Sequence, residues 1–241
     1  MRYGIFSDVH ANLEALTALI QVFEVEGIDQ YFCAGDVVGY GANPQECIDF
    51  IQKLNAVCVA GNHDWGVVDK FDIKNFNSAA QDAVLWTKKH VHAEHNRFLE
   101  NLPLTFKNKD FTLVHGTLAA PQNFDYLFDS EQAQDTFDLM SRPVCFIGHT
   151  HIPQIFFQQE RLVISEQARD IKIHPQRKYI VNVGSVGQPR DGIPLAAYGI
   201  YDTAAKEISI RRVAYPIEEA QQKIIQAGLP RILAERLKEG Q

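Results

Sequence analysis

Five short segments of the chain are rich in Asp, Asn and His, and each directly follows a short apolar run. In chain order they are Asp8-Val9-His10, Gly35-Asp36, Gly61-Asn62-His63-Asp64, His115-Gly116 and Gly148-His149-Thr150-His151. Carboxylate and amide oxygens mixed with imidazole nitrogens suit Mn, Fe, Zn, Co or Ni, whereas calcium and thiolate sites use other donors. The segments therefore predict a site for divalent metal ions, with metal-assisted hydrolysis as its chemistry.

The candidate ligands are too many for a single ion. They comprise three oxygen donors and four imidazoles, namely Asp8, His10, Asp36, Asn62, His115, His149 and His151. One divalent ion takes about four to six ligands, so this set suits two ions better than one. A carboxylate such as Asp36 could bridge two ions about 3.5–4 Å apart, and such a pair can clamp the attacking and leaving oxygens of a phosphoryl displacement.

Each of these residues, taken alone, has an ordinary structural interpretation. A histidine in a turn is commonly a surface residue, an aspartate after a strand can cap a helix, and asparagine is frequent in turns. Their joint occurrence after five successive strand-like runs favours one common site. We expect the glycines beside Asp36, Asn62, His115 and His149 to allow tight turns that aim these side chains into a shared cleft.

The elements that must position these segments alternate over the first sixty residues. Residues 3–7, 30–34 and 56–60 have the pattern of short buried strands, and residues 12–25 and 44–54 that of amphipathic helices. This order predicts parallel strands joined by right-handed crossovers. Ligands bind at the carboxyl ends of such strands, which is where the Asp, Asn and His segments lie.

The rest of the chain is helical at first and then rich in strands. We expect helix over residues 71–102 and again from Pro216, and a hairpin loop at 202–206. Further strands are expected at 111–114, 144–147, 155–157, 162–164, 179–183, 196–201 and 208–213. A sheet-rich second half after a βαβ first half predicts two stacked sheets flanked by helices.

Composition narrows the function classes. The 241 residues include 30 acidic and 23 basic side chains, a formal net charge of −7. That balance argues against a protein that grips an extended nucleic acid, which would need a basic face. The chain has no apolar stretch of about 20 residues, no secretory leader after Met1, and four scattered cysteines without a metal-binding spacing. These features predict a cytoplasmic protein that does not span a membrane.

The five segments resemble, in residue types and order, the five motifs of the calcineurin-like metallophosphoesterase superfamily. The glycine-rich segment 184–192 resembles one found in bacterial and archaeal phosphodiesterase-type members of that superfamily. The matching motifs run from residue 8 to residue 151, and residues 155–213 would supply the family's final strands. The resemblance implies a four-layer α/β/β/α sandwich with mixed sheets. It also implies a single domain over residues 1–241, with C-terminal helices at about 216–239 packed on it.

The resemblance also implies roles for individual residues. Asp8, His10, Asp36 and His151 would hold one metal ion, and Asp36, Asn62, His115 and His149 the other. His63 would lie over the substrate as a general acid or phosphate contact, oriented by Asp64. A metal-bound hydroxide would then attack phosphorus while the imidazolium of His63 protonates the leaving oxygen. The expected cofactors are two ions of Mn, Fe, Zn, Ni, Co or Mg, with Mn favoured.

The chain departs from some relatives in its phosphate-binding residues. Ser/Thr protein phosphatases and symmetric dinucleoside tetraphosphatases carry an Asp-Arg pair shortly after the second motif, whereas residues 35–41 contain no arginine here. Arg190, in the glycine-rich segment 184–192, is the candidate substitute. The alternative to this phosphate-binding role is a structural turn in which Arg190 pairs with Asp191 or faces solvent. Asn12 is a second candidate phosphate contact, and its alternative is a helix N-cap.

Three other histidines, His90, His92 and His95, cluster on one predicted helix, where we expect them on an exposed surface. Tyr40 is a candidate lining residue of the substrate pocket. The predicted function is dinuclear-metal hydrolysis of phosphodiester bonds in small substrates, nucleotides among the candidates. The alternatives are a Ser/Thr phosphoprotein phosphatase or a dinucleoside tetraphosphatase. A non-catalytic scaffold and a nuclease are less favoured, and oligomeric state is left open.

Overall fold

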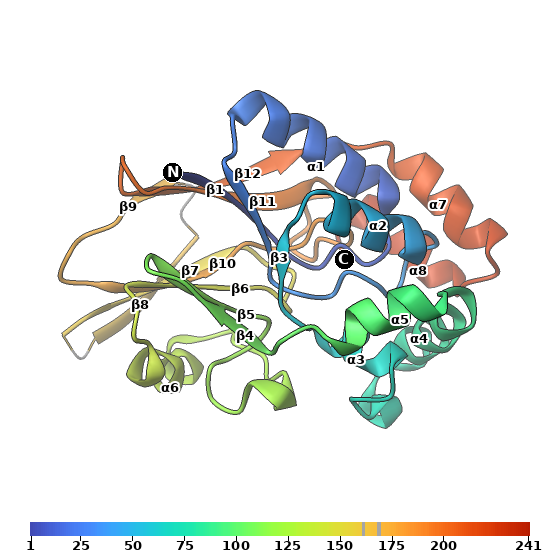
Figure 1. The fold of residues 1–241 in the computed structure, drawn as a ribbon, viewed down its shortest axis with the longest axis horizontal. Helices are drawn as coiled ribbons and strands as arrows, with labels where there is room; N and C mark the ends of the chain where they lie inside the picture. Colours follow the sequence, from blue (N-terminus) through green and yellow to red (C-terminus); the bar gives the residue numbers. More distant parts are fainter. Residues whose placement is uncertain (161, 168–169) are drawn as a thin grey trace.

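The computed structural model describes residues 1–160, 162–167 and 170–241. Two six-stranded mixed sheets stack face to face, with helices over the outer face of each sheet (Figure 1). This arrangement confirms the predicted four-layer α/β/β/α sandwich.

The first sheet has the strand order β3-β2-β1-β11-β12-β9. Its strands are β1 (Arg2–Phe6), β2 (Gln30–Cys33), β3 (Val57–Cys58), β9 (Asp170–Lys172), β11 (Ala196–Asp202) and β12 (Glu207–Val213). As predicted, β1, β2 and β3 run parallel, and α1 (Leu13–Glu26) and α2 (Pro44–Lys53) form the crossovers between them. The remaining pairs are antiparallel, and the loop between β11 and β12 is the predicted hairpin.

The second sheet has the order β4-β5-β6-β10-β7-β8. Its strands are β4 (Thr105–Lys107), β5 (Phe111–Val114), β6 (Val144–Ile147), β7 (Gln154–Gln159), β8 (Leu162–Glu166) and β10 (Lys178–Asn182). In its centre β5, β6 and β10 are parallel. Sequence analysis missed β4 and β9 because these three-residue edge strands are largely exposed and lack an apolar run.

The helical segment predicted over residues 71–102 is not continuous. It contains the short 3₁₀ turn η1 (Ile73–Asn75), then α4 (Ser78–His90) and α5 (Ala93–Glu100), and it is preceded by α3 (Asn62–Val67). Asn77 caps α4, and extended backbone at Val91 and His92 separates the two longer helices. A second 3₁₀ turn, η2 (Pro121–Asn123), and α6 (Ser130–Leu139) were not predicted.

The C-terminal segment forms two helices. They are α7 (Ile217–Gln226) and α8 (Arg231–Glu239), separated at Gly228, which has a positive φ, and Pro230. Helix α7 packs against both α1 and α8 over the outer face of the first sheet (Figure 1).

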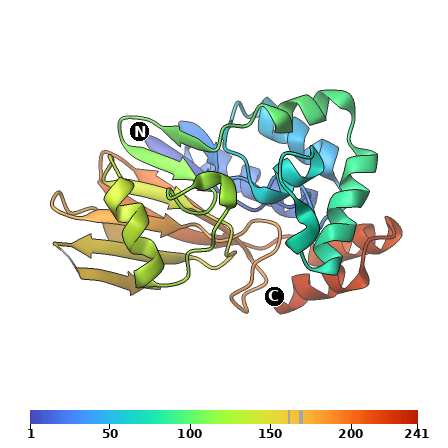
Figure 2. The same cartoon turned by 90° about the horizontal axis from the view of Figure 1, so that it is seen from below.

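Apolar side chains fill the three interfaces between the four layers. Along β1, Ile5 points into the space between the sheets, whereas Phe6 points toward the helices. Between the sheets, the ring of Phe111 packs edge-on against Phe146 with the ring centres 5.2 Å apart. On the far side, α6 lies across the second sheet and buries Phe137 there (Figure 2).

No helix in the described part of the chain has the length and apolar character needed to cross a membrane. All four cysteines are buried free thiols.

The packing between the sheets predicts that a substitution there strongly lowers the stability of the fold. We expect Phe146→Ala to lower the free energy of unfolding by about 3–5 kcal/mol, because it leaves a cavity among Phe111, Tyr201 and their neighbours. Urea unfolding followed by circular dichroism measures the change. Leu85→Ala, at a helix position that is 47% exposed, is the control and should cost less than about 1 kcal/mol. Equal costs for the two variants would contradict this account of the core.

Candidate metal centre

The five polar segments converge where the carboxyl ends of β1, β2, β3, β5 and β6 meet, as the sequence predicted. Backbone hydrogen bonds join the segments within each sheet, from Asp8 N to Gly35 O (2.9 Å) and from Gly148 N to His115 O (3.0 Å). A side-chain bond joins the two sheets, because the backbone N–H of His149 donates to Oδ2 of Asp8 (3.0 Å). All seven predicted ligand side chains are buried in this region.

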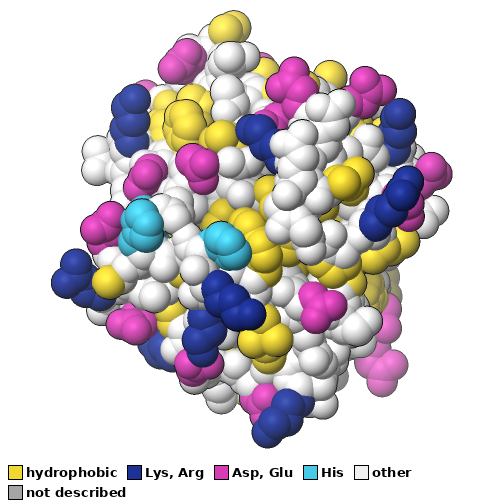
Figure 3. All heavy atoms as spheres, turned by 90° about the vertical axis from the view of Figure 1, so that its right-hand side faces the viewer, with side chains coloured by type: hydrophobic (Ala, Val, Ile, Leu, Met, Phe, Trp, Pro, Cys, Tyr) yellow, Lys and Arg dark blue, Asp and Glu magenta, His cyan; other side chains and the backbone are white. Residues whose placement is uncertain are grey.

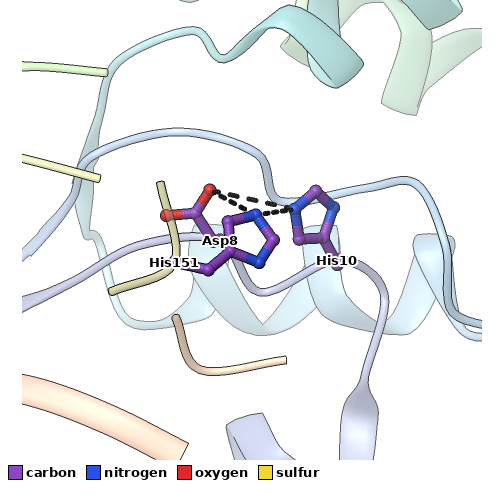
Figure 4. A group of neighbouring side chains, drawn as sticks. All are labelled: Asp8, His10 and His151. Atoms are coloured by element: carbon purple, nitrogen blue, oxygen red, sulfur yellow. Dashed lines mark hydrogen bonds and ion pairs between the residues drawn. The ribbon is translucent and has the colours of Figure 1, made fainter. Parts of the chain in front are cut away.

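Asp8, His10 and His151 form the first group of donor atoms (Figure 4). Nε2 of His10 lies 3.1 Å from Nε2 of His151, and Oδ1 of Asp8 lies 3.2 Å from the latter. The Nδ1 atoms of the two rings face backbone oxygens, Val38 O at 3.0 Å and Gln188 O at 2.5 Å. A carbonyl oxygen only accepts, so we assign a proton to each Nδ1, which leaves both Nε2 atoms with lone pairs that face each other. A cation between them would turn this repulsion into coordination.

Asp36, Asn62, His115 and His149 form the second group. Nε2 of His115 lies 3.3 Å from Oδ2 of Asp36 and 3.2 Å from Oδ1 of Asn62. Its Nδ1 faces Ala34 O at 2.8 Å, so this ring is held in the same way as the two in the first group. His149 completes the group with Asp36 and His115.

Asp36 lies between the two groups. Its Oδ2 atom is 3.6 Å from Nε2 of His10 and 3.3 Å from Nε2 of His115, while Oδ1 accepts a hydrogen bond from the backbone N–H of His63 (2.9 Å). Burial opposes the charge of Asp36, but His115 and the other imidazoles hold the pKa of Asp36 well below its usual range. In return, Asp36 raises the pKa of His115 to about 10 against the effect of burial.

Two buried atoms of the cluster have no hydrogen-bond partner within the described residues, Oδ1 of Asp8 and Nε2 of His149. An unpaired buried polar atom costs about 1–3 kcal/mol, which a bound cation would remove. The donor set, its burial and these two unpaired atoms fit divalent metal ions.

The ligand residues themselves adopt left-handed backbone conformations. Five of them have φ between +48° and +69°, namely Asp8, His10, Asp36, His149 and His151. Such a conformation costs a non-glycine residue roughly 1–2 kcal/mol and is found mainly where a functional site requires it.

The neighbouring glycines therefore act differently from the prediction. Only Gly35, with φ of +99°, supplies a left-handed turn beside a ligand. Gly61 and Gly148 instead make room, because a Cβ atom at Gly61 would collide with Asp36 Oδ1 and one at Gly148 with Ser7 Oγ and Asp8 Oδ2.

Asp64 does not orient the ring of His63, contrary to the sequence-based expectation. Its carboxylate is fully buried and accepts four backbone N–H groups at 2.8 to 3.2 Å, which belong to Asp36, Val37, Val38 and Gly61. Burial and the charge of Asp36 raise the pKa of Asp64 to about 7. Asp64 thus holds the turn that presents Asp36.

His63 lies among aromatic rings. Its ring centre is 4.5 Å from Tyr40, 4.9 Å from His10 and 4.9 Å from Phe76, and its Nδ1 atom has no hydrogen-bond partner in the described structure. Burial lowers the pKa of His63 to about 4, which favours the neutral ring in the substrate-free protein.

Arg190 reaches the centre from the segment after β10. Its guanidinium donates to Oε1 of Gln188 at 3.0 Å and to the hydroxyl of Tyr40 at 3.3 Å. The predicted alternative of an Arg190–Asp191 pair is wrong, because Asp191 pairs with Arg212. The positive charge of Arg190 contributes to the lowered pKa values of His10, His63 and His151.

Asn12 has the helix-cap role that sequence analysis gave as its alternative. Oδ1 accepts from the backbone N–H of Ala15 (3.1 Å) at the start of α1, and Nδ2 donates to Gly187 O (2.9 Å). The side chain ties α1 to the turn that carries Arg190, so we do not retain it as a phosphate contact.

Tyr126 is a site residue that sequence analysis missed. Its ring stacks on His149 with the centres 3.9 Å apart and the planes 13° apart. It lies in the irregular segment between β5 and α6, where no periodicity or motif marks it. His95, expected on an exposed surface, is instead 4% exposed and bonded to Oδ1 of Asp49 (3.1 Å), away from the centre.

Comparison with known proteins identifies the family. The model of the calcineurin-like phosphoesterase superfamily domain matches residues 1–206. The chain belongs to the calcineurin-like phosphoesterase superfamily. It is 42% identical to the uncharacterized protein MJ0912 of Methanocaldococcus jannaschii over 97% of this chain and 96% of that one. Membership supports a metal-dependent phosphoester hydrolase, in agreement with the clustered Asp and His side chains.

Solved structures of this superfamily share the fold. A metallophosphoesterase from Sphaerobacter thermophilus is 36% identical and superposes with a TM-score of 0.87, over 100% of this chain and 99% of that one. The hypothetical protein PH1004 from Pyrococcus horikoshii is 18% identical with a TM-score of 0.80, over 100% and 98% of the two chains. Beyond residue 206 this phosphoesterase continues with β12, which pairs with β11, and with α7, which packs on α1.

The space that Gly148 leaves for Asp8 predicts a loss of metal without a loss of fold. We expect Gly148→Ala to displace the Asp8 carboxylate and reduce bound metal to less than half of the wild-type content, measured by inductively coupled plasma mass spectrometry. Gly228→Ala is the control, because it strains a left-handed residue with open space around it. That variant should lose about 1 kcal/mol of stability and keep its metal. Full metal content in a folded Gly148→Ala protein would contradict the packing argument.

Proposed function

We propose that this protein is a dinuclear-metal phosphoesterase that hydrolyses phosphodiester bonds in small substrates. The observation that carries the proposal is the position of Asp36, whose Oδ2 atom faces one imidazole Nε2 from each of the two donor groups. A carboxylate shared in this way is the bridge that a pair of divalent ions needs.

The two groups divide the predicted ligands between two ions. The first ion would be held by Asp8, His10, Asp36 and His151, and the second by Asp36, Asn62, His115 and His149. Two clusters of donor atoms support this division, one formed by Asp8, His10 and His151 and the other by Asp36, His115 and His149. When bound, the ions would lower the pKa of a coordinated water and neutralise charge on the phosphoryl oxygens. Manganese is the favoured metal because the donors are hard and borderline and include no thiolate, and Fe, Zn, Ni, Co and Mg remain candidates.

His63 and Arg190 are the chain's own groups for the substrate. His63 lines the cavity beside the centre, where it would contact the phosphoryl group or give a proton to the leaving oxygen. A phosphate anion beside the ring would raise its pKa from the value in the substrate-free protein. Among the described residues no carboxylate pairs with Arg190, so its guanidinium is available for a bidentate contact with phosphate oxygens.

Charge favours small substrates over extended nucleic acid. The net charge is −7, and on the helical face of Figure 3 Lys and Arg side chains are interspersed with Asp and Glu rather than gathered in a basic patch. Four buried free thiols support a reducing compartment, and we infer the cytoplasm.

Hydrolysis of bis-p-nitrophenyl phosphate, compared with p-nitrophenyl phosphate, tests the proposed reaction. Metal-free protein reconstituted with Mn, Ni, Mg or Zn should turn over the diester faster than the monoester. Asp36→Ala should abolish turnover and lower metal content, because both ions lose a ligand. Turnover of the monoester alone would favour a phosphatase instead, and no turnover with two bound equivalents would contradict the proposal.

His63→Ala separates a substrate-contact role from a metal-binding role. We expect kcat for the diester to fall about a hundredfold while metal content stays at the wild-type value. His90→Ala, at an exposed position at the end of α4, is the matched control and should change neither quantity. Loss of metal from His63→Ala would instead place this ring among the ligands.

Arg190→Ala tests the phosphate contact. KM for the diester should rise about tenfold, since a charge-assisted hydrogen bond to substrate is lost. Arg211→Ala, which removes a half-exposed arginine on β12, should leave KM unchanged. An unchanged KM in Arg190→Ala would assign Arg190 to the support of Tyr40 and Gln188.

A further inference from the structure

A cavity of about 410 Å³ opens beside the metal centre, a volume typical of small-molecule sites. Three residues of the centre line it, namely Asn62, His63 and His149. The other walls come from residues 71–80, which include η1 and the start of α4, and from the segment 123–126 after η2. A substrate group attached to a phosphate at the metals would therefore extend into this cavity.

Aromatic rings form most of the cavity's apolar surface. Phe76 lies 4.9 Å from His63 and 6.0 Å from Phe71, measured between ring centres. Phe71 in turn packs edge-on against Phe124 at 5.1 Å. Tyr126, which is 45% exposed, covers His149 at the other side of the opening. Surfaces of this kind bind flat, unsaturated groups by stacking.

The polar groups of the cavity are neutral amides rather than cations. The cavity is lined by three exposed asparagines, Asn75, Asn77 and Asn123. Oδ1 of Asn77 accepts the capping hydrogen bond of α4, so the NH₂ group of this side chain is free to donate. None of the residues that line this cavity in the described structure is Lys or Arg, and Asp125 adds a negative charge. The amides of the cavity therefore suit a neutral group with hydrogen-bonding edges.

The cation that could bind phosphate lies at the edge of this cavity. Arg190 is not among its lining residues, but its guanidinium donates to the hydroxyl of Tyr40, which lines the cavity, and also interacts with the side chain of Tyr126 on the cavity wall. A molecule with an anionic group beside a flat neutral group would thus place the first at the metal ligands and Arg190 and the second among the aromatic rings. A nucleotide has these two parts joined by one sugar.

We propose that this cavity binds the nucleobase of a nucleotide diester, with Phe76 and Phe71 as stacking surfaces and the amides of Asn75, Asn77 and Asn123 at the base edge. The inference rests on the proposed phosphoesterase function for the position of the phosphate.

Isothermal titration calorimetry of the Mn-reconstituted protein tests the cavity without relying on turnover. The probes are AMP and ribose 5-phosphate, which share the sugar phosphate and differ in the base, and inorganic phosphate is assayed afterwards to confirm that neither was cleaved. AMP should bind about tenfold more tightly than ribose 5-phosphate, because a base that stacks on one aromatic side chain adds about this much to the affinity. Equal affinities would overturn the inference.

A matched pair of substitutions at Phe76 assigns the effect to the ring. Phe76→Leu should bring the AMP affinity down to that of ribose 5-phosphate, and Phe76→Tyr should keep the difference; ribose 5-phosphate should bind both variants as it binds the wild type. Circular dichroism and metal content confirm that both variants are folded and loaded. An AMP preference that survives Phe76→Leu would place the base elsewhere and overturn the assignment.

The outcomes also separate this inference from the proposed function. Tight AMP binding without any diester hydrolysis would support the nucleobase cavity and refute the phosphodiesterase. Diester hydrolysis with equal binding of AMP and ribose 5-phosphate would support the enzyme and refute the cavity. A phosphoserine peptide that binds more tightly than AMP would likewise refute it, in favour of a protein substrate.

Discussion

Seven buried donor groups, four imidazoles and three side-chain oxygens, have to be held within reach of one another at the rim of the sandwich. Asp36 and His115 attract each other, but the Nε2 lone pairs of His10 and His151 face each other at 3.1 Å and repel. The restraint comes from the surrounding backbone. Carbonyl oxygens hold the Nδ1 atoms of three rings, and left-handed turns direct five of the ligands inward. The folded chain therefore sustains local strain and repulsion that bound cations would relieve.

Asp64 shows how far this restraint extends beyond the ligands. Its carboxylate accepts hydrogen bonds from four backbone N–H groups in two loops, one after β2 and one after β3. These bonds fix the turn that contains Asp36. The stacked sheets provide the second level of restraint. Parallel strands from both sheets end at the same rim, and the aromatic core between them keeps Asp8 beside His149.

The surroundings of the centre combine a cation with aromatic rings. Arg190, supported by Gln188 and Tyr40, provides positive charge beside the metal ligands. Aromatic rings and asparagine amides line the adjacent cavity, to which Tyr40 also belongs. A phosphate and the group attached to it would therefore meet different side chains. These side chains come from segments that lie far apart in the chain, among them residues 71–80, 123–126 and 184–192.

The amino-acid sequence by itself determined the four-layer architecture, the family and the seven donor side chains that the structure brings together. These follow from local patterns, since apolar runs mark buried strands and each polar segment sits directly after one of them. Short exposed edge strands such as β4 and the break at Val91 were missed, because they lack such a pattern.

Only the tertiary structure decided what each neighbouring side chain does. Asp64 follows His63 in sequence and was expected to orient its ring, yet it bonds the backbone of a distant loop. Asn12 caps a helix, Asp191 pairs with Arg212 rather than Arg190, and Tyr126 reaches His149 from an irregular segment. Donor types and strand ends are local properties of the chain. Hydrogen-bond partners, the protonation of a buried imidazole and the walls of a cavity depend on which distant segments pack together, and packing alone sets them.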